Sequence, residues 1–431
     1  MKILFIQPRN ERNLSNLGKA VNNISGTPYM SIQQLIAATP KEHTVELIDE
    51  RFENINFEEK FDLVAIMKCF TIYALRSYEI ADNFRKKGIP VILSGDHPTA
   101  FPDEAKQHAD SIVIGEQEGI WKTVLKDAER KQLNSYYKAE KYLEPENIPP
   151  HRCDIGRFPI PSGRVEIARG CPQACDFCMH PVLYGTNYRL RPFENIMEEI
   201  RNIKQRNILF TEPSLTLAPE LTKRIFKEMK SLNKRFICYG HTDILSKDED
   251  LLKLSSEAGC LAWWIDFESL SQETINYINK KHNKIEEYAS CINKIHEYSI
   301  AAVGTLIFGL DTDTLDIFDK TQDALNKWEI DAVEVNTVCP FPGTPLFKRL
   351  DAEGRILTRD WSKYNEWNIV YQPKHMTPEE LLENSIRVAR EFYSYPNFLK
   401  RIIRSLKLRF PSFLYTFTQN YLERRFYNSK F

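Results

Sequence analysis

The sequence predicts an α/β protein made of two parallel-sheet units followed by a helix-rich C-terminal region. Short runs of Val, Ile and Leu alternate with amphipathic helical patterns over the first 130 residues, and a second such series begins at Arg164. Apolar strands separated by helices are typical of a parallel sheet covered on both faces. The chain has 431 residues, 42% of them hydrophobic and 27% charged, which suits two or three globular domains.

The first unit, residues 1–130, is predicted to be a Rossmann-like, doubly wound sheet. Its expected strands are Lys2–Ile6, Thr44–Ile48, Leu63–Met67, Val91–Ser94 and Ser111–Ile114. No G-x-G-x-x-G follows the first of them, so the dinucleotide fingerprint of dehydrogenases is absent. The polar, proline-containing residues 131–162 have the composition of a linker.

The second unit, residues 163–345, contains six βα repeats and predicts a partial (β/α)6 barrel. Its expected strands are 164–168, 208–212, 236–241, 262–268, 303–308 and 333–338. Chemistry in such barrels gathers at the carboxyl ends of the strands. That rule selects a group of cysteines and then Glu212, His241, Glu268, Gly309 and Asn336. Residues 346–431 are expected to be mostly helical.

Composition excludes several classes of protein. The formal net charge of −1 gives no general attraction to nucleic acid. No apolar run is long enough for a transmembrane helix, and the N-terminus reads as a strand rather than a signal peptide. With nine cysteines and no export signal, a reducing cytoplasmic location is expected. Six of the cysteines have no companion spacing and are expected to be small core residues, with Cys339 also a candidate thiol for radical chemistry: Cys69, Cys153, Cys238, Cys260, Cys291 and Cys339.

The remaining cysteines form a C-x3-C-x2-C loop after the first strand of the second unit: Cys171, Cys175 and Cys178. Three thiolates converging from a short loop can hold a four-iron cluster and leave one iron open. A structural zinc site with His180 as fourth ligand is the alternative, although the spacing is not the usual pair of dipeptides.

The loop from Arg169 to Cys178 resembles the signature of the radical S-adenosylmethionine (SAM) superfamily, including the aromatic Phe177 before the third cysteine. The resemblance extends over roughly residues 2–395. It implies a [4Fe–4S] cluster on Cys171, Cys175 and Cys178 that binds SAM at its open iron, cleaves it reductively and starts a radical reaction.

The resemblance also implies contacts with SAM. Phe177 corresponds to the residue whose backbone meets the adenine, and Gly309 to the glycine near that ring. Glu268 corresponds to a carboxylate that contacts the ribose. Glu212 stands where the family contacts the methionyl amine, although this sequence lacks the glycines that normally precede that glutamate.

The first unit resembles the cobalamin-binding domain often fused ahead of this barrel. The sequences Ser94–Thr99 and Ile114–Glu118 occupy the strand ends where that domain places its ligand loops. The D-x-H-x-x-G motif is missing, which leaves two alternatives open. With cobalamin, the implied reaction is methyl transfer to an unreactive carbon; without it, deoxygenation, cyclisation or C–C coupling.

The implied partners are a small-molecule or lipid substrate and an electron donor such as flavodoxin or ferredoxin. Modification of RNA or a peptide and a non-catalytic, zinc-stabilised binding protein are the competing functions. No RNA-binding or extra-cluster domain is evident.

The C-terminal tail combines apolar and basic residues at helical spacing between Phe398 and Phe410. Such a helix either docks on its own domain or lies on an anionic membrane at the inner face. Both alternatives stay open at this point.

Overall fold

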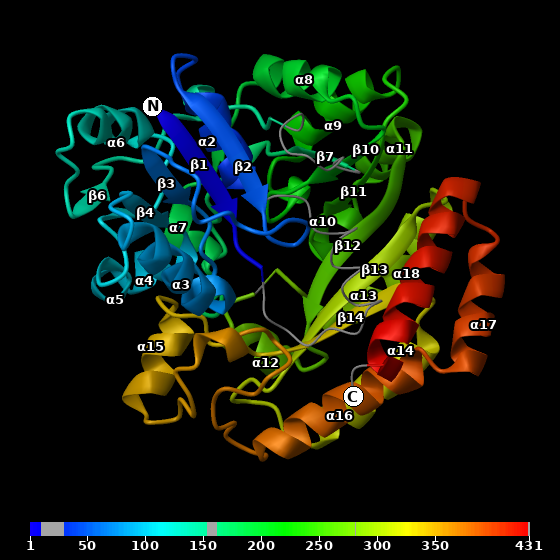
Figure 1. The fold of residues 1–431 in the computed structure, drawn as a ribbon. Coiled ribbons are helices and arrows are strands. Elements are labelled where there is room, and N and C mark those ends of the chain that lie inside the picture. The colour runs from blue at the N-terminus through cyan, green and yellow to red at the C-terminus, as the bar shows by residue number, and fades with distance from the viewer. Residues whose placement is uncertain (10–29, 153–161, 281, 430–431) are drawn as a thin grey trace.

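Two six-stranded parallel sheets form the framework of the protein, and Figure 1 shows the first in blue and cyan beside the second in green and yellow. The structure is a computed structural model that describes residues 1–9, 30–152, 162–280 and 282–429. The predicted class is confirmed: an α/β fold with a doubly wound sheet, a partial (β/α)6 barrel and a helical C-terminal region.

The N-terminal sheet has the strand order β2-β1-β3-β4-β5-β6, and all of its pairs are parallel. Its strands are β1 (Lys2–Gln7), β2 (Thr44–Asp49), β3 (Leu63–Ile66), β4 (Val91–Ser94), β5 (Ser111–Ile114) and β6 (Tyr136–Lys138). Its helices are α2 (Met30–Ala38), α3 (Ala74–Arg85), α4 (Asp96–Ala100), α5 (Pro102–Lys106) and α6 (Trp121–Glu129). Strands β3 and β4 are buried at every position, as expected for a sheet covered on both faces. The order reverses between β1 and β3, and ligands of such sheets bind beyond the carboxyl ends of the strands near that point.

One strand of this sheet lies in the stretch that reads as a linker. Strand β6 adds the sixth position at residues 136–138, and Tyr137 is only 4% exposed. Its hydroxyl donates to Asp127 at 2.8 Å and so ties the strand to α6. Residues 153–161, which include Cys153 and two of the linker prolines, lie outside the described part of the chain.

The second sheet is the partial barrel, with the strand order β14-β13-β12-β11-β10-β7 and parallel pairing throughout. Its strands are β7 (Gly163–Val165), β10 (Asn207–Phe210), β11 (Arg235–Tyr239), β12 (Cys260–Glu268), β13 (Ala301–Phe308) and β14 (Ala332–Thr337). Its helices are α7 (His180–Tyr184), α8 (Phe193–Asn202), α9 (Pro219–Met229), α10 (Thr242–Leu245), α11 (Glu249–Ala258), α12 (Gln272–Tyr277), α13 (Tyr288–Glu297) and α14 (Asp316–Lys327).

The first barrel strand is shorter than the predicted 164–168. Strand β7 ends at Val165, and the chain then forms β8 (Ala168–Arg169), which pairs with β9 (Arg189–Leu190) as a small antiparallel hairpin. The cysteine loop lies inside this hairpin. The hairpin therefore fixes both ends of the loop independently of the main sheet.

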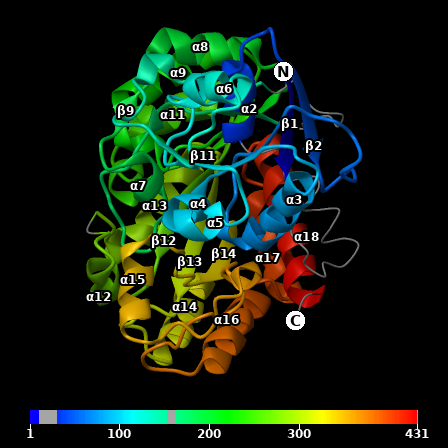
Figure 2. The ribbon, with the colours of Figure 1, turned by 60° about the vertical axis from the view of Figure 1, so that its left-hand side comes forward.

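The C-terminal helices are α15 (Pro345–Ala352), α16 (Pro378–Phe392), α17 (Tyr395–Ser405) and α18 (Phe410–Ser429). Figures 1 and 2 show α18, in red, running beside β12, β13 and β14. Leu408 and Tyr415 pack against inward-facing residues of the barrel such as Trp264, whose indole N–H donates to the Tyr415 hydroxyl at 2.9 Å. The barrel wall is thus completed by a segment distant in sequence.

The lone cysteines behave as the sequence predicts wherever the structure describes them. Cys69, Cys238, Cys260, Cys291 and Cys339 are all buried, and the sulfurs of Cys238 and Cys260 lie 3.9 Å apart. In the described part of the chain, no helix is both long enough and apolar enough to cross a bilayer.

Candidate active site

The three cysteines of the loop follow the first strand of the barrel sheet and lie within electrostatic range of one another. Gly170 introduces the loop with φ +83°, and a Cβ at this position would lie 2.0 Å from the Asn187 carbonyl oxygen, so only glycine fits. The backbone N–H of Cys178 donates to the carbonyl of Cys175 at 3.1 Å, which turns the chain back toward Cys171.

Burial dominates the acid–base properties of these thiols. It raises the pKa of Cys175 to about 12 and of Cys178 to about 11, and it also raises the pKa of Cys171. Mutual repulsion among the three groups adds to the shift at Cys175, which places them within electrostatic range of one another. The thiols are therefore protonated without a cation, and binding iron must displace their protons.

The zinc alternative finds little support in the arrangement of ligands. Among the described residues, no three His, Cys, Asp or Glu side chains are placed to hold a single metal ion. His180 donates its backbone N–H to the Cys178 sulfur at 3.4 Å, while its ring lies against Tyr184 and its Nε2 has no hydrogen-bond partner. Thiolates of a four-iron cluster bind different irons and stand further apart than the ligands of one ion.

Glu268 and Lys280 form a buried ion pair that faces the cysteine loop. The Lys280 ammonium lies 2.5 Å from a Glu268 oxygen and 3.6 Å from Asp266. Its positive charge lowers the pKa of all three loop cysteines, whereas Glu268 raises that of Cys175 and Cys178. Burial raises the pKa of Glu268, and Lys280 opposes that shift. The structure therefore brings Glu268 beside the loop, together with a lysine that the strand-end rule does not select.

The end of β12 is bent so that Glu268 can point this way. Glu268 has φ +63°, and the pairing of β12 with β13 shifts register between Asp266 and Glu268. The carbonyl of Asp266 accepts from Asn283 at 2.7 Å, and that of Phe267 accepts from the Tyr288 hydroxyl at 2.9 Å. A non-glycine residue at positive φ costs about 1 to 3 kcal/mol, and these bonds hold it there.

Glu212 lies after β10 with one carboxylate oxygen free. Its Oε2 accepts from the backbone N–H of Ile167 at 3.1 Å, whereas Oε1 is buried and has no hydrogen-bond partner among the residues that the structure describes. The residue is 3% exposed, and burial raises its pKa to about 8. A buried, unpartnered acceptor at this place fits an ammonium group of a ligand.

Gly309 follows β13, and the side chains of Tyr371 and Leu381 pack directly against it. Its φ is +97°, and a Cβ would meet the Tyr371 hydroxyl at 2.4 Å and Leu381 at 2.5 Å. The Tyr371 hydroxyl donates to the Gly309 carbonyl at 2.5 Å. The glycine is therefore required by packing against the C-terminal region. Phe177 lies in the cysteine loop and packs against the barrel core.

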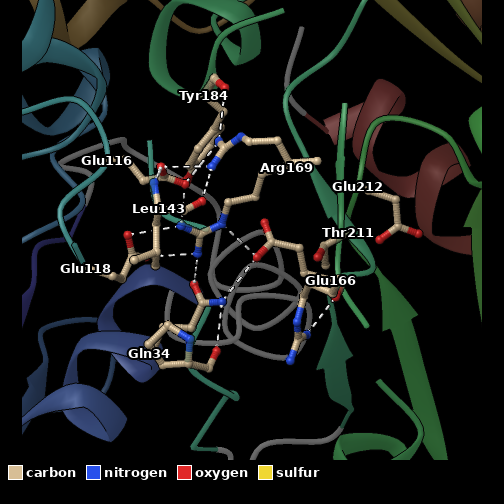
Figure 3. Close-up of polar contacts among 12 residues, drawn as sticks. Gln34, Glu116, Glu118, Leu143, Glu166, Arg169, Tyr184, Thr211 and Glu212 are labelled. Atoms are coloured by element: carbon tan, nitrogen blue, oxygen red, sulfur yellow. Dashed lines mark hydrogen bonds and ion pairs between the residues drawn. The ribbon is translucent and has the colours of Figure 1, made fainter. Parts of the chain in front are cut away.

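Arg169, two residues before Cys171, joins the cysteine loop to the N-terminal unit (Figure 3). Its guanidinium is 1% exposed and donates to Glu116 at 2.8 Å, to both oxygens of Glu118 at 3.1 Å and to Gln34 at 3.0 Å. Its Nε donates to Glu166 of the barrel at 3.0 Å. Every N–H of the side chain is thereby used.

The same contacts define the edge of the N-terminal sheet. Glu116 and Glu118 lie in the Ile114–Glu118 sequence after β5, and Glu116 also pairs with Arg189 of the hairpin at 3.2 Å. After β3 and β4, Lys68 and Asp96 form a buried pair at 3.1 Å. In the same region, a Cβ on Gly95 would lie 2.5 Å from the backbone nitrogen of Cys69. The carboxyl edges of the two sheets thus meet across a charged, hydrogen-bonded interface.

Other strand-end residues have their own neighbours. The His241 ring lies 4.2 Å from the His282 ring, and burial lowers the pKa of His241 to about 2. Asn336 and Asp243 each have a buried side-chain oxygen that finds no hydrogen-bond partner within the described ranges. Cys339 belongs to the core shared with the N-terminal unit, which separates it from the loop cysteines.

Sequence reasoning missed Lys280 and Arg169. Lys280 follows a helix rather than a strand, so only three-dimensional proximity reveals it. Arg169 is part of the recognised loop, but its partners Gln34 and Glu118 are 135 and 51 residues away in sequence.

Two family models match the chain. One, described as the radical SAM superfamily, covers residues 165–325. The other, described as a domain of unknown function (DUF4070), covers residues 344–425.

Similar proteins of known name include several methyltransferases. The bacteriochlorophyllide d C-12(1)-methyltransferase of Chlorobaculum tepidum is 29% identical over 93% of this chain and 89% of its own length. The hopanoid C-2 methylase of Rhodopseudomonas palustris is 24% identical over 77% and 66%, respectively. The anaerobic magnesium-protoporphyrin IX monomethyl ester cyclase of Rubrivivax gelatinosus is 28% identical over 61% and 48%.

Two solved structures share the fold over most of the chain. OxsB, a cobalamin-dependent SAM radical enzyme with aqua-cobalamin and SAM bound, superposes with a TM-score of 0.68 at 15% identity over 98% of this chain and 71% of its own. TsrM from Kitasatospora setae, a radical SAM methyltransferase with cobalamin and a [4Fe–4S] cluster, gives 0.66 at 16% identity over 82% and 78%. At such identities the likeness concerns the fold.

Proposed function

Since this chain belongs to the radical SAM superfamily, in the subgroup with an N-terminal domain of the cobalamin-binding type, we propose that it transfers a methyl group to an unreactive carbon of a small, apolar molecule. The observation that carries the proposal is the junction at Arg169, where the cysteine loop of the barrel meets the strand-end loops of the N-terminal sheet. Relatives named as methyltransferases support methyl transfer over cyclisation.

The proposed cluster ligands are Cys171, Cys175 and Cys178. When bound, the cluster and SAM supply a hydrogen-abstracting radical, and cobalamin supplies a transferable methyl group. The protein's own part is to bury the thiols, to place the Lys280 charge beside them, and to keep the loop fixed against the N-terminal unit through Arg169. A cation near several thiolates lowers the cost of their shared negative charge.

The proposed contacts with SAM follow from the polar groups around the loop. The unpartnered Oε1 of Glu212 is proposed to accept from the methionyl ammonium. Glu268, held in place by Lys280, is proposed to accept from the ribose hydroxyls. The backbones of Phe177 and Gly309 are proposed to line the adenine site. Substitution of Glu268 by glutamine, which keeps the shape and a hydrogen bond to Lys280, tests this role more cleanly than alanine: SAM binding should weaken while iron content is unchanged.

The test of the overall function is anaerobic purification followed by product analysis. The protein should carry about four irons per chain, and alanine at any of the three cysteines should remove them. With cobalamin, a reductant and SAM labelled in its methyl group, S-adenosylhomocysteine and labelled methylcobalamin should form, together with 5′-deoxyadenosine. Formation of 5′-deoxyadenosine without S-adenosylhomocysteine would favour cyclisation or another methyl-free reaction. Colourless protein with zinc and no SAM cleavage contradicts the whole assignment.

A reductant is required by the family, and a flavodoxin or ferredoxin is the proposed donor. The test is to mix the purified protein with such a donor and to follow the loss of its brown colour. A protein that dithionite bleaches but the donor does not contradicts this choice of donor.

A second, finer proposal concerns contact with a membrane through the C-terminal helices. Helix α17 docks through Arg401 and Ser405, which are buried, while Ile403 and Leu406 are 67% and 64% exposed. The apolar face of this helix therefore points outward. An amphipathic helix that docks on its own domain normally buries its apolar face and exposes its charged one. The exposed apolar residues continue along α18: Phe410, Leu414, Phe417 and Tyr421. We call the exposed apolar residues of α17 and α18 the apolar stripe.

Vesicle sedimentation tests this contact. Truncation before α17 is unsuitable because α18 supplies buried residues to the barrel. Serine at Ile403 should lower partitioning onto vesicles at least about tenfold, since burying such a side chain contributes about 1.5 to 3 kcal/mol. Leu357→Ser is the matched control, because Leu357 is 53% exposed but lies outside the stripe. Equal losses in both variants contradict the proposal.

A further inference from the structure

A small cavity with cationic walls lies between α14, α16 and α17. Its volume is about 280 Å³, and three of its lining residues come from one face of α17: Lys400, Arg401 and Arg404. One carboxylate, that of Glu391, also lines it. The walls therefore carry an excess of positive charge that the described protein groups do not balance.

Arg401 is the buried cation of this cavity. It is 5% exposed, and its guanidinium stacks 3.7 Å above the Phe392 ring. Its Nε donates to the Asn420 side chain at 3.0 Å, while Nη2 is buried with no hydrogen-bond partner in the described part of the chain. Among the described residues no carboxylate lies within ion-pair distance of it, and burial lowers the pKa of Arg401 to about 10. Burying a charge in this way is costly unless an anion compensates it.

Arg404 and Lys400 complete the charged wall. Arg404 donates to the Ile330 carbonyl at 2.6 Å, but its Nε is also buried without a partner. Asp331 acts on Arg401 and Arg404, and Glu329 acts on Arg404. The Oδ2 of Asp331 binds the His296 ring at 2.7 Å and a backbone N–H, and Glu329 pairs with Lys407. Lys400 is exposed at the rim. Three cationic side chains and one carboxylate thus line the cavity, and a net positive charge of this kind is the chemistry that binds a phosphate.

The cavity borders the apolar stripe. Lys400 and Arg404 directly follow Leu399 and Ile403 in sequence, so on the helix the cations flank the exposed apolar side chains. Apolar side chains with cations at their edge match the layering of a membrane surface, where acyl chains lie beneath phosphates.

We propose that this cavity holds the phosphate of an anionic phospholipid while the apolar stripe lies in the acyl layer. The proposal rests on the membrane contact proposed above and deepens it by naming the lipid class and the residues that bind it. It also provides a counter-anion for the buried Arg401.

The test compares vesicles of phosphatidylcholine with vesicles that also contain phosphatidylglycerol, using the full-length protein. A basic residue near an anionic surface contributes about fivefold to binding. Lys400→Gln should therefore lower the affinity for phosphatidylglycerol vesicles about fivefold and leave the affinity for phosphatidylcholine unchanged. Arg404→Gln should act in the same direction, and thermal unfolding of each variant shows whether it is folded.

Lys407→Gln is the matched control on the same helix. Lys407 lies outside the cavity, and its charge is paired with Glu329 at 2.5 Å. Its substitution should change the affinity by less than about twofold. Equal effects of Lys400→Gln and Lys407→Gln overturn the phosphate site.

The remaining outcomes separate the two proposals. Wild-type protein that binds both kinds of vesicle equally keeps the membrane contact and overturns the proposed anionic lipid, since both headgroups carry a phosphate and only phosphatidylglycerol has a net charge. Failure to bind either kind overturns both. Inorganic phosphate or glycerol 3-phosphate that raises the Tm of the wild type but not of Lys400→Gln, without vesicle binding, assigns the cavity to a soluble anion and overturns the lipid. A dimer that Ile403→Ser dissociates assigns the stripe to a second copy of the chain and likewise overturns it.

Discussion

Replacement of Arg169 by methionine should weaken the junction between the N-terminal unit and the barrel by about 3 to 5 kcal/mol, the usual cost of breaking a buried ion pair from one side. Methionine keeps most of the apolar volume, so the loss is mainly electrostatic. The substitution removes the hydrogen bonds to Glu116, Glu118, Glu166 and Gln34.

The size of the effect follows from what each acceptor retains. Glu116 keeps Arg189, and Glu166 keeps the Gln34 amide at 3.2 Å. Glu118, with 1% side-chain exposure, loses the guanidinium that binds both of its oxygens. A buried carboxylate left without its cation keeps its full desolvation cost, which makes Glu118 the main source of the loss. The double variant with Glu118→Gln removes the orphaned charge and should recover about half of the loss.

The assay is urea unfolding of cluster-free protein, which keeps iron binding out of the measurement. Arg359→Gln serves as the control, since its pair with Asp351 at 2.6 Å is 54% and 38% exposed and should cost under about 1 kcal/mol. A midpoint for Arg169→Met equal to that of Arg359→Gln refutes the reasoning. So does a double variant whose loss is the sum of the two single losses, because coupling within the network is then absent.

Three further predictions concern the site. Gly309→Ala should destabilise the protein by about 2 to 4 kcal/mol in thermal unfolding, because the new Cβ collides with the side chains packed on this glycine. The control is Gly88→Ala, which has a similar φ but nothing within 4 Å of the new Cβ and should cost only about 1 kcal/mol. Equal costs for the two variants argue against the clash. Burial raises the pKa of Glu212 to about 8, so the folded apoprotein binds its proton more tightly than the unfolded chain and loses stability as pH rises from about 4.5 to 8. Glu212→Gln should therefore gain stability relative to wild type by up to about 1.4 kcal/mol per pH unit across this window, and parallel pH profiles contradict the shift. Lys280→Met should lower the iron content after anaerobic reconstitution severalfold, with the exposed Lys284→Met as control, and full iron content in both variants rules out a role for the charge.

Much of the fold follows from local pattern. Strands such as Val91–Ser94 are continuous apolar runs with no competing helical period, and they lie where the pattern places them. Strand β6 was missed because three residues, Tyr136–Lys138, in a polar and proline-containing stretch carry too little pattern; they pair because β5 offers a free edge. The hairpin of β8 and β9 was missed for the same reason, as each strand has only two residues.

The candidate site was predictable where chemistry is local in sequence. The cysteine spacing and the strand-end position of Glu268 are both readable from the chain, and the structure brings these residues together. The ion pair of Lys280, the buried network of Arg169 and the outward apolar face of α17 all depend on which surfaces meet. Helical periodicity places Ile403 on the apolar face of α17, but it does not reveal that this helix docks through the face that carries Arg401.

The position of α18 has a consequence for how the enzyme is made. Trp264 and its partner Tyr415 are 151 residues apart, so the barrel completes its wall only after synthesis has passed α18. The loop cysteines emerge long before that, when β12, β13 and β14 still lack the helix that packs beside them. Delivery of iron and sulfide is therefore expected to follow synthesis of α18 rather than of the loop, and a chain stalled before this helix would offer its three thiols to oxidation.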